Sequence, residues 1–543
     1  MMKVCVIATN SGQKHLKKVL TVMLNNLRDG KKLFSFYIPV LIAAVYLVLA
    51  IASVQYDDIT FDESAHLLYG TQIIKGNPDR SVNEERFRST MPVSALNALP
   101  RAVEQLLHPG TKKNDWGKDD VKNGRYITIL LTLVLLFYCF RFSASLTSDK
   151  VGCVIMSFIA FDPNVLAHSR LVTTDIYAAI GFIATIYHLG KWLSAKEPRQ
   201  FYYWCVAIAV AQCCKPNNVL LYPISLIPVI FYAYKNKVVF IPKNIVFKIL
   251  VFAVIQVVII NAFFLFSGPW GCSLAQLHVR SGFFTSLQAS WVAKIPLPFS
   301  KAYIETFDLV QYERETFDGT ALNYLAGELR YKKGFWNYYL ICYGLKTPLI
   351  SILLTVTGII YSLVFSKIRM VSLIFCCWPC LFVFIFLSNS SIQNGYRYLI
   401  PVTCLSLIFT SWLLEAVVKK IPEITLLCFS FIPLLTAIMA FPNYLAYSNM
   451  LVAEKKLAYR FLADSNFNWG QRNSALQNFL SVHPDYIFEP SVPVTGMIVV
   501  DLNNLAGIKT PEKFKWLREN YVPVATIDDC YLIYNVKQLP AGK

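Results

Sequence analysis

Charged residues are scarce in this chain. Asp, Glu, Lys and Arg together make up 15% of its 543 residues, whereas about a quarter of a soluble protein is charged. Apolar runs of about twenty residues recur instead, and this length crosses a hydrocarbon core of ~30 Å. The composition therefore argues against a soluble multi-domain enzyme and predicts a polytopic α-helical membrane protein.

Acidic residues are the scarcer charged class, since 33 Asp and Glu stand against 51 Lys and Arg. The resulting net charge of +18 does not predict a nucleic-acid partner, because the basic residues lie mostly beside apolar runs. Membrane proteins place their cytoplasmic anchors there, and such residues also contact anionic lipid headgroups. We therefore expect membrane lipids, and no nucleic acid, among the partners.

A disulfide framework is not expected, although the chain has 14 Cys. Most of them lie inside apolar runs, where cysteine acts as a small buried hydrophobic residue. Cys377 and Cys380 have the spacing of a redox or metal motif, but they lie within an apolar run with no His or Asp nearby. No cofactor chemistry is therefore predicted for these two cysteines.

About eleven apolar segments are interpreted as membrane spans, and several of them are short or contain Pro. Such breaks are tolerated where the backbone is buried in protein or lines a cavity. The expected spans cover residues 34–54, 125–146, 150–166, 173–193, 201–215, 217–234, 248–266, 348–366, 370–387, 398–418 and 421–440.

Short basic connections between the spans indicate the orientation. Lys31 and Lys32 precede the first span, so residues 1–33 are expected in the cytoplasm. Counting spans from there places the other short basic connections on the same face, which supports an odd number of spans. These connections contain Lys150, Lys196, Arg199, Lys235, Lys237, Lys367, Arg369, Lys419 and Lys420.

Three larger polar segments are expected on the opposite, extracytoplasmic face. Two of them, 55–124 and 267–347, are loops of a transmembrane domain that covers residues 34–440. The third is the tail 441–543. The tail is the most polar segment and combines strand patterns with a helical pattern, so it predicts a small α/β domain. The strand patterns cover 494–500 and 531–536, and the helical pattern covers 511–519.

The densest polar motif lies just outside the first span and contains the adjacent carboxylates Asp62 and Glu63. A carboxylate is a natural general base. Thr60 and Glu63 also fit a capping box that begins a helix ending near Gly76. Glu63 therefore has a capping and a catalytic interpretation, whereas the capping box does not explain Asp62, which is the stronger candidate base.

A second acidic motif, Thr174-Asp175, lies near the outer end of the fourth expected span. Asp175 caps this helix in the simplest interpretation. Because it faces the same compartment as Asp62, it can also orient an acceptor, hold a base or bind a divalent ion. A divalent metal thus stays an open expectation, and no other cofactor is predicted.

Cations at the outer face run against the usual charge bias of membrane proteins. Lys215 lies at the turn between the fifth and sixth spans, Lys346 precedes the eighth, and Arg397 precedes the tenth. Arg170 belongs to the same outer segment as Asp175. These side chains either anchor span ends or stabilise a phosphate leaving group, which Arg can hold through two parallel hydrogen bonds.

Taken in order, these motifs resemble the phospholipid-carrier-dependent glycosyltransferases of the GT-C class, in particular family 39 and the bacterial type of protein O-mannosyltransferase. Bacterial lipid A aminoarabinose transferases belong to the same class. The resemblance runs from about residue 55 to 536. Its motifs are Asp62-Glu63, Thr174-Asp175, Lys215-Pro216, Tyr338-Tyr339, Lys346-Thr347-Pro348 and Arg397-Tyr398-Leu399-Ile400-Pro401.

The most specific likeness lies in the tail. Asp464, Asn466, Trp469 and Gln471 resemble the Asp-Ser-Asn-x-Asp-Trp-Gly-Gln signature of bacterial members. Two positions depart from the family pattern. Residues 89–93 read Ser-Thr-Met-Pro-Val where the family often has His-Pro-Pro-Leu, and Asn468 stands in place of the usual Asp. Both departures bear on the identity of the acceptor.

The resemblance implies a GT-C-like membrane fold and the transfer of a sugar from a polyprenyl-phosphate donor to a protein, lipid or glycan acceptor. It places the reaction at the extracytoplasmic face of a bacterial inner membrane. The implied site residues are the catalytic Asp62, Glu63 and Asp175 and the donor-phosphate ligands Lys215, Lys346, Arg397 and Arg170. The alternatives are a transporter or flippase of lipid-linked sugars, which would place ionisable residues in mid-span, and a catalytically inactive relative.

Overall fold

A computed structural model describes most of the chain. It covers residues 32–80, 89–108, 117–194, 197–235, 243–268, 271–316, 323–365, 370, 373–508 and 510–539. The expected cytoplasmic segment up to Lys31, and the basic positions Lys196, Lys237, Lys367 and Arg369, lie outside these residues.

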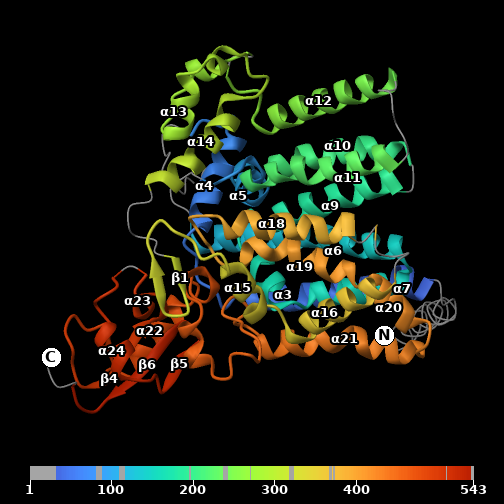
Figure 1. Ribbon diagram of the computed structural model, residues 1–543. Coiled ribbons are helices and arrows are strands. Elements are labelled where there is room, and N and C mark those ends of the chain that lie inside the picture. Colours follow the sequence, from blue (N-terminus) through green and yellow to red (C-terminus); the bar gives the residue numbers. More distant parts are fainter. Residues whose placement is uncertain are drawn as a thin grey trace, which may run out of the picture.

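The membrane domain is a bundle of helices that run roughly side by side (Figure 1). Each of the eleven expected spans coincides with at least one helix, so the predicted polytopic helical class is confirmed. The helices are α3 (Ile38–Val54), α6 (Lys118–Leu146), α7 (Asp149–Ala160), α8 (Pro163–Ser169), α9 (Asp175–Ser194), α10 (Arg199–Gln212), α11 (Leu221–Lys235), α12 (Lys243–Phe263), α15 (Tyr338–Lys346), α16 (Leu349–Val364), α18 (Trp378–Ser388), α19 (Ile400–Phe409), α20 (Ser411–Val418) and α21 (Glu423–Ala440). The π-helical turns η1 (Leu33–Tyr37) and η7 (Leu373–Cys377) and the 3₁₀ turns η4 (Pro216–Leu220) and η8 (Tyr396–Leu399) extend four of these helices.

The number of membrane-crossing helices differs from eleven. In the described part of the chain, seven helices are long and apolar enough to cross, and two bent pairs raise the number to nine. The pairs are α7 with α8, bent by 67°, and α15 with α16, bent by 117°. Pro163 begins α8 and Pro348 precedes α16, which agrees with the tendency of Pro to end a preceding helix. The expected spans at 201–215 and 370–387 correspond to shorter helices.

The first two outer segments gather at one end of the bundle, beside the tail (Figure 1). Polar contacts join them: the backbone N–H of Ala326 donates to the carbonyl of Phe461 at 2.9 Å, and the N–H of Asp58 donates to that of Gln471 at 3.0 Å. Their elements are α4 (Glu63–Ile74), η3 (Pro92–Ser94), α5 (Ala95–Leu107), η5 (Leu274–Gln276), α13 (Gly282–Gln288), η6 (Trp291–Lys294), α14 (Lys301–Thr316), β1 (Asn323–Leu325) and β2 (Glu328–Arg330).

The tail contains the α/β unit expected from its sequence. Its sheet has the strand order β3-β4-β6-β5, in which β4 pairs antiparallel with β6 and parallel with β3. The buried side chains of β4 and β6 form its core. Its elements are η9 (Lys455–Arg460), η10 (Asp464–Asn466), α22 (Asn473–Val482), β3 (Ile487–Phe488), β4 (Gly496–Asp501), α23 (Leu502–Ala506), α24 (Lys515–Asn520), β5 (Ala525–Ile527) and β6 (Tyr531–Val536).

The thirteen cysteines in the described part of the chain are free thiols, and most of them are buried. This agrees with the interpretation of these residues as small buried hydrophobic side chains. Among the described residues no disulfide links the tail to the bundle, so packing and polar contacts hold the tail against it.

Candidate active site

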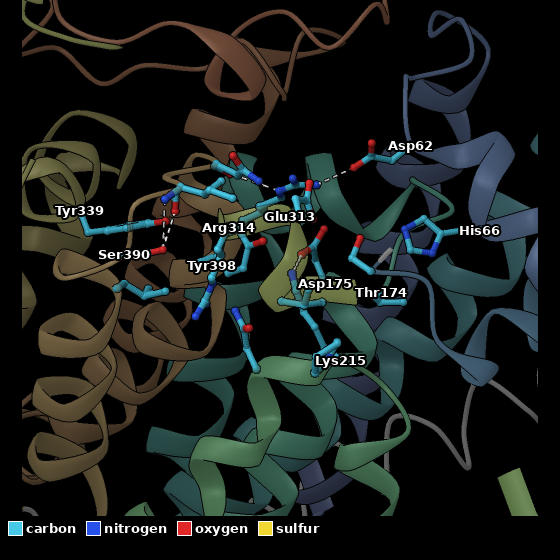
Figure 2. A pocket seen from close by; sticks show the side chains of 18 residues that line it. Asp62, His66, Thr174, Asp175, Lys215, Glu313, Arg314, Tyr339, Ser390 and Tyr398 are labelled. Carbon is cyan, nitrogen blue, oxygen red and sulfur yellow. Dashed lines mark hydrogen bonds and ion pairs between the residues drawn. The ribbon is translucent and has the colours of Figure 1, made fainter. Parts of the chain in front are cut away.

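A pocket with about 950 Å³ of empty volume lies at the end of the bundle where the outer segments meet. Asp62 and His66 lie on one side of it, Tyr339 and Ser390 on the other, and Asp175 and Lys215 between them (Figure 2). The lining residues are Asp62, His66, Ser89, Thr174, Asp175, Lys215, Pro216, Asn217, Val310, Glu313, Arg314, Tyr339, Leu387, Ser390, Ile392, Asn394, Arg397 and Tyr398.

One acid–base pair in this pocket joins the first outer segment to a late span. A carboxylate oxygen of Asp62, directly before α4, lies 2.9 Å from Nη1 of Arg397 in η8. The side chains keep 29% and 13% of their surface exposed, so both can meet a ligand in the pocket. Arg397 is further held by its Nε, which donates to the carbonyl of Asn394 at 3.1 Å.

A second acid–base pair lies deeper. Asp175, the first residue of α9, forms an ion pair with Lys215, which directly precedes η4. An acid is favourable in the first turn of a helix because it faces the positive end of the helix dipole. Only 2% of the Asp175 side chain and 10% of the Lys215 side chain are exposed. The Lys215 ammonium also lies 4.0 Å from the centre of the Tyr398 ring.

His66 lines the pocket and was not predicted. It follows Asp62 by four residues, so helical periodicity brings both onto one face of the same turn. This spacing was the signal in the sequence. Burial lowers the pKa of His66 to about 4, although Asp62 and Asp175 nearby favour its charged form. The ring is therefore neutral at pH 7, and its Nδ1 lies 3.3 Å from the hydroxyl of Ser94.

Two further pocket residues, Glu313 and Arg314, were also not predicted. They belong to α14 in the second outer segment. Nothing in the sequence pairs this polar helix with Asp62 or Arg397. Only the tertiary structure brings α14 to the end of the bundle that contains the pocket.

Glu63 lies outside the pocket lining and is fully buried. Its carboxylate lies 2.6 Å from Nη2 of Arg125 and accepts hydrogen bonds from the backbone N–H groups of Thr60 at 2.8 Å and Val172 at 2.9 Å. The Thr60 contact is the one that the capping box predicts, although α4 itself begins at Glu63. Burial alone would raise the pKa of Glu63, but Arg125 and these hydrogen bonds hold it below its usual value.

Arg170 also lies outside the pocket lining. It forms a buried ion pair with Asp57 at 2.6 Å and donates to the backbone carbonyls of Ser53 and Pro442. The other oxygen of Asp57 lies 3.4 Å from Nη2 of Arg472 in the tail. Asp57, in the first outer segment, thus contacts both the turn between α8 and α9 and the tail.

Lys346 is the third predicted residue that does not line the pocket. Its ammonium is buried and donates to the backbone carbonyls of Leu445, at 2.8 Å, and Asn466. It therefore joins the end of α15 to two segments that follow the last span. The geometry assigns this cation to the junction with the tail.

The tail signature lies behind the pocket. The side-chain oxygen of Asn466 accepts a hydrogen bond from the backbone N–H of Tyr396 at 3.1 Å, and that of Gln471 accepts from the N–H of Trp469 at 2.6 Å. Asp464 adopts a positive φ of 61°, and burial raises the pKa of its carboxyl. None of these four signature residues lines the pocket in the described part of the chain.

The structure gives a reason for one departure from the family pattern. The side-chain amide of Asn468 donates to the carboxylate of Asp501, and its oxygen accepts from the N–H of Gly470 at 2.9 Å. An Asp at position 468 would bring two carboxylates together, so Asn suits this chain. At the other departure, Ser89 lines the pocket.

The described residues contain no group of three or more His, Cys, Asp and Glu side chains placed to hold a metal ion. Two of the pocket acids, Asp62 and Asp175, each have a cation as partner.

Comparisons with known proteins found a family that part of the chain resembles. Residues 117–261 match the family described as dolichyl-phosphate-mannose-protein mannosyltransferase. A search of the curated proteins found no match. The matched segment contains Asp175 and Lys215, but not Asp62 or Arg397.

The structure is also similar to solved structures of two other proteins. One is ArnT from Cupriavidus metallidurans bound to undecaprenyl phosphate, with 12% identity, a TM-score of 0.42, and coverage of 93% of this chain and 99% of that chain. The other is the archaeal oligosaccharyltransferase AglB from Archaeoglobus fulgidus in complex with an inhibitory peptide and a dolichol-phosphate. Its identity is 12% and its TM-score 0.43, and the match covers 82% of this chain and 60% of that chain. The chain is thus an integral membrane protein whose segment 117–261 is similar to the dolichyl-phosphate-mannose-protein mannosyltransferase family.

Proposed function

We propose that this protein is a glycosyltransferase that moves a sugar from a polyprenyl-phosphate carrier to an acceptor in the pocket around Asp62 and Asp175. The observation that carries this proposal is the pair of carboxylate–cation contacts, Asp62 with Arg397 and Asp175 with Lys215, facing one pocket at the ends of membrane helices. The family match over residues 117–261 supports the same donor class.

The chemistry requires both kinds of charge. Transfer breaks the bond between the anomeric carbon and the phosphate oxygen and forms a bond from that carbon to the acceptor oxygen. The acceptor proton goes to a general base, and the carrier phosphate leaves with the bonding electron pair. Cations that are already in place stabilise the charge that develops on this phosphate.

The existing ion pair of Asp62 suggests how its carboxylate becomes available as the general base. The carboxylate of Asp62 is held by the guanidinium of Arg397. A donor phosphate that binds Arg397 through two parallel hydrogen bonds competes with Asp62 for the guanidinium. Asp62 is then free to accept the acceptor proton, and its side chain is more exposed than that of Asp175.

Asp175 and Lys215 serve a different part of this proposal. Because Asp175 is almost fully buried, it is better placed to orient Lys215 than to meet an acceptor. Lys215 then acts as a point charge on the donor phosphate. Arg314, on the α14 side of the pocket, is a third cation within reach of an anionic ligand.

The proposed face is the extracytoplasmic side of a bacterial inner membrane, and the acceptor is a protein, a lipid or a glycan. The gathering of the outer segments and the tail at one end of the bundle supports this orientation. At the other end, Lys150 and Glu423 form an ion pair at 2.8 Å between the starts of α7 and α21, as expected for a short basic cytoplasmic connection.

The test is a transfer assay with the purified full-length protein. Labelled polyprenyl-phosphate sugars are offered one at a time with a membrane extract, and label is then measured in separated protein, lipid and glycan fractions. The proposal expects label in one fraction, released donor carrier, and loss of both in Asp62→Asn. Movement of intact donor across a vesicle bilayer with no new glycosidic bond would establish the transporter alternative instead.

A further inference from the structure

The segment 466–471 of the tail contacts Arg397 and Phe61, the residue before Asp62, from outside the pocket. It begins at Asn466, the last residue of η10, and Trp469 is only 8% exposed. The proposed transfer reaction uses none of its side chains. Its position raises the question of what it contributes to the site.

On the Arg397 side, the segment holds the backbone. Asn466 accepts a hydrogen bond from the N–H of Tyr396, the residue before Arg397, while its amide donates to the hydroxyl of Tyr338 at 2.9 Å. Gly395 lies against this contact with a φ of +75°. A Cβ at that position would lie 3.1 Å from the Asn466 side-chain oxygen. The same Cβ would lie 2.9 Å from the hydroxyl of Ser465, so a side chain at position 395 would displace one or both of these neighbours.

The guanidinium of Arg397 is held as well. Its central carbon lies 4.5 Å from the centre of the Trp469 ring, a distance at which the ring face attracts a cation. Trp is the aromatic side chain that makes this interaction best. The ring therefore limits the directions in which Arg397 can point.

On the Asp62 side, the same residue acts through its backbone. The carbonyl of Trp469 accepts a hydrogen bond at 3.2 Å from the N–H of Phe61, the neighbour of Asp62. Gln471 accepts from the Trp469 N–H and donates to the carbonyl of Phe467 at 2.7 Å. These contacts fix the turn that presents Trp469.

We propose that Asn466 and Trp469 are positioning residues of the transfer reaction, which set Arg397 relative to Asp62 so that donor phosphate and base are aligned. The inference rests on the proposed function and assigns the tail signature a task within it. The tail thereby controls the geometry of a pocket that it does not line. Small misplacements of catalytic groups are costly because transfer needs reacting atoms at near-contact distance.

The test is a double-mutant cycle between Trp469 and Arg397. Trp469→Leu keeps apolar bulk but removes the aromatic face, and Trp469→Phe keeps the face. We expect Trp469→Leu to lower kcat/KM for the donor about three- to thirty-fold, and Trp469→Phe to retain most of it. In an Arg397→Lys background, which keeps the charge but loses the planar guanidinium, Trp469→Leu should have a clearly smaller effect.

The outcomes separate the two proposals. If the wild-type protein transfers no sugar, the proposed function fails before the cycle begins. If the wild type transfers sugar but Trp469→Leu has the same effect in both backgrounds, or Phe is no better than Leu, the positioning role is overturned. Trp516→Ala, a tail Trp whose ring packs on Tyr521, serves as the control for a general loss of tail stability.

Gly395→Ala provides an independent check from the other side of the contact. The added methyl group meets Asn466 and forces a positive φ on a residue with a side chain. We expect kcat to fall at least ten-fold while the protein stays folded by thermal unfolding. A normal kcat in folded Gly395→Ala would contradict the role of Asn466.

Discussion

The carboxylate of Asp62 and the guanidinium of Arg397 lie 2.9 Å apart, although 335 residues separate them in the chain. One stands where the first span leaves the bundle, and the other stands where a late span begins. The pair therefore exists only when the two ends of the membrane domain are assembled. Its accessibility from the pocket makes it the natural place to test the proposed chemistry.

Asp62→Asn should abolish most turnover without unfolding the protein. The change keeps the shape and removes the base, so kcat should fall by roughly two to four orders of magnitude. Stability should change little because the side chain is partly exposed. The control is Asp119→Asn, at an exposed acid in the first turn of α6. Near-normal turnover of Asp62→Asn would make Asp175 the next candidate base.

Glu63→Gln should behave as a stability variant. It leaves Arg125 buried without its counter-ion, and breaking such a pair by removing one partner costs about 3–5 kcal/mol. Thermal unfolding in detergent should show a large loss, partly recovered in Glu63→Gln/Arg125→Gln. A variant with wild-type stability and no turnover would return Glu63 to the catalytic role that the sequence suggested.

Lys215→Met should weaken use of the donor more than use of the acceptor. Loss of one charge-assisted hydrogen bond costs about 1.5–3 kcal/mol, or roughly ten- to a hundred-fold in the KM for the donor. Because Asp175 would be left buried and unpaired, the measurement should include Asp175→Asn/Lys215→Met, which removes both charges. Unchanged donor kinetics in both proteins would reduce Lys215 to an anchor at a span end.

His66 should make the protein less stable as the pH falls from about 6.5 to 4. Its folded pKa of about 4 lies below the unfolded value of 6.5, so in this window the unfolded state binds the extra proton. At pH 5 the loss is about 2 kcal/mol relative to pH 8. His66→Gln should flatten this part of the stability–pH curve. An identical slope in both proteins would show that His66 is not buried as a neutral ring.

The orientation can be tested with exposed thiols. Cys530 is buried, so Ser491→Cys, at an exposed tail position, is the better probe. We expect an impermeant thiol reagent to label it in cells whose cytoplasmic membrane is intact. Lys420→Cys, at the other end of the bundle, should react only after permeabilisation. The reverse pattern would place the pocket in the cytoplasm.

Much of the fold could be predicted from the sequence because it depends on local signals. Apolar runs gave helices at all eleven expected places, and alternation in the tail gave the strands β4 and β6. The short span expected at 201–215 matches the 14-residue helix α10. Hydropathy did not show that the pair α15 and α16 bends by 117°. Helix length and bending depend on neighbours, which a hydropathy window does not contain.

The pocket residues also show what local sequence patterns can and cannot predict. Asp62, Asp175, Lys215 and Arg397 were expected at one face, and the structure brings them to one pocket. Glu63 had both a capping and a catalytic interpretation, but its partner Arg125 lies 62 residues away, where a local sequence pattern does not reveal it. For the same reason, the sequence could not show that Arg170 and Lys346 are bound to other parts of the chain.

The Asp57 ion-pair group has a consequence for biosynthesis. Arg472 donates to the carbonyl of Tyr56, 416 residues earlier in the chain, and reaches Asp57 beside it. Synthesis at about 5–20 residues per second delays Arg472 by roughly 20–80 s after that turn. Until Arg472 is made, Arg170 is the one of these two arginines that can pair with Asp57, and the segment that holds Arg397 does not yet exist. A nascent chain can thus insert its spans early, while its pocket takes shape only after the ribosome has delivered the tail.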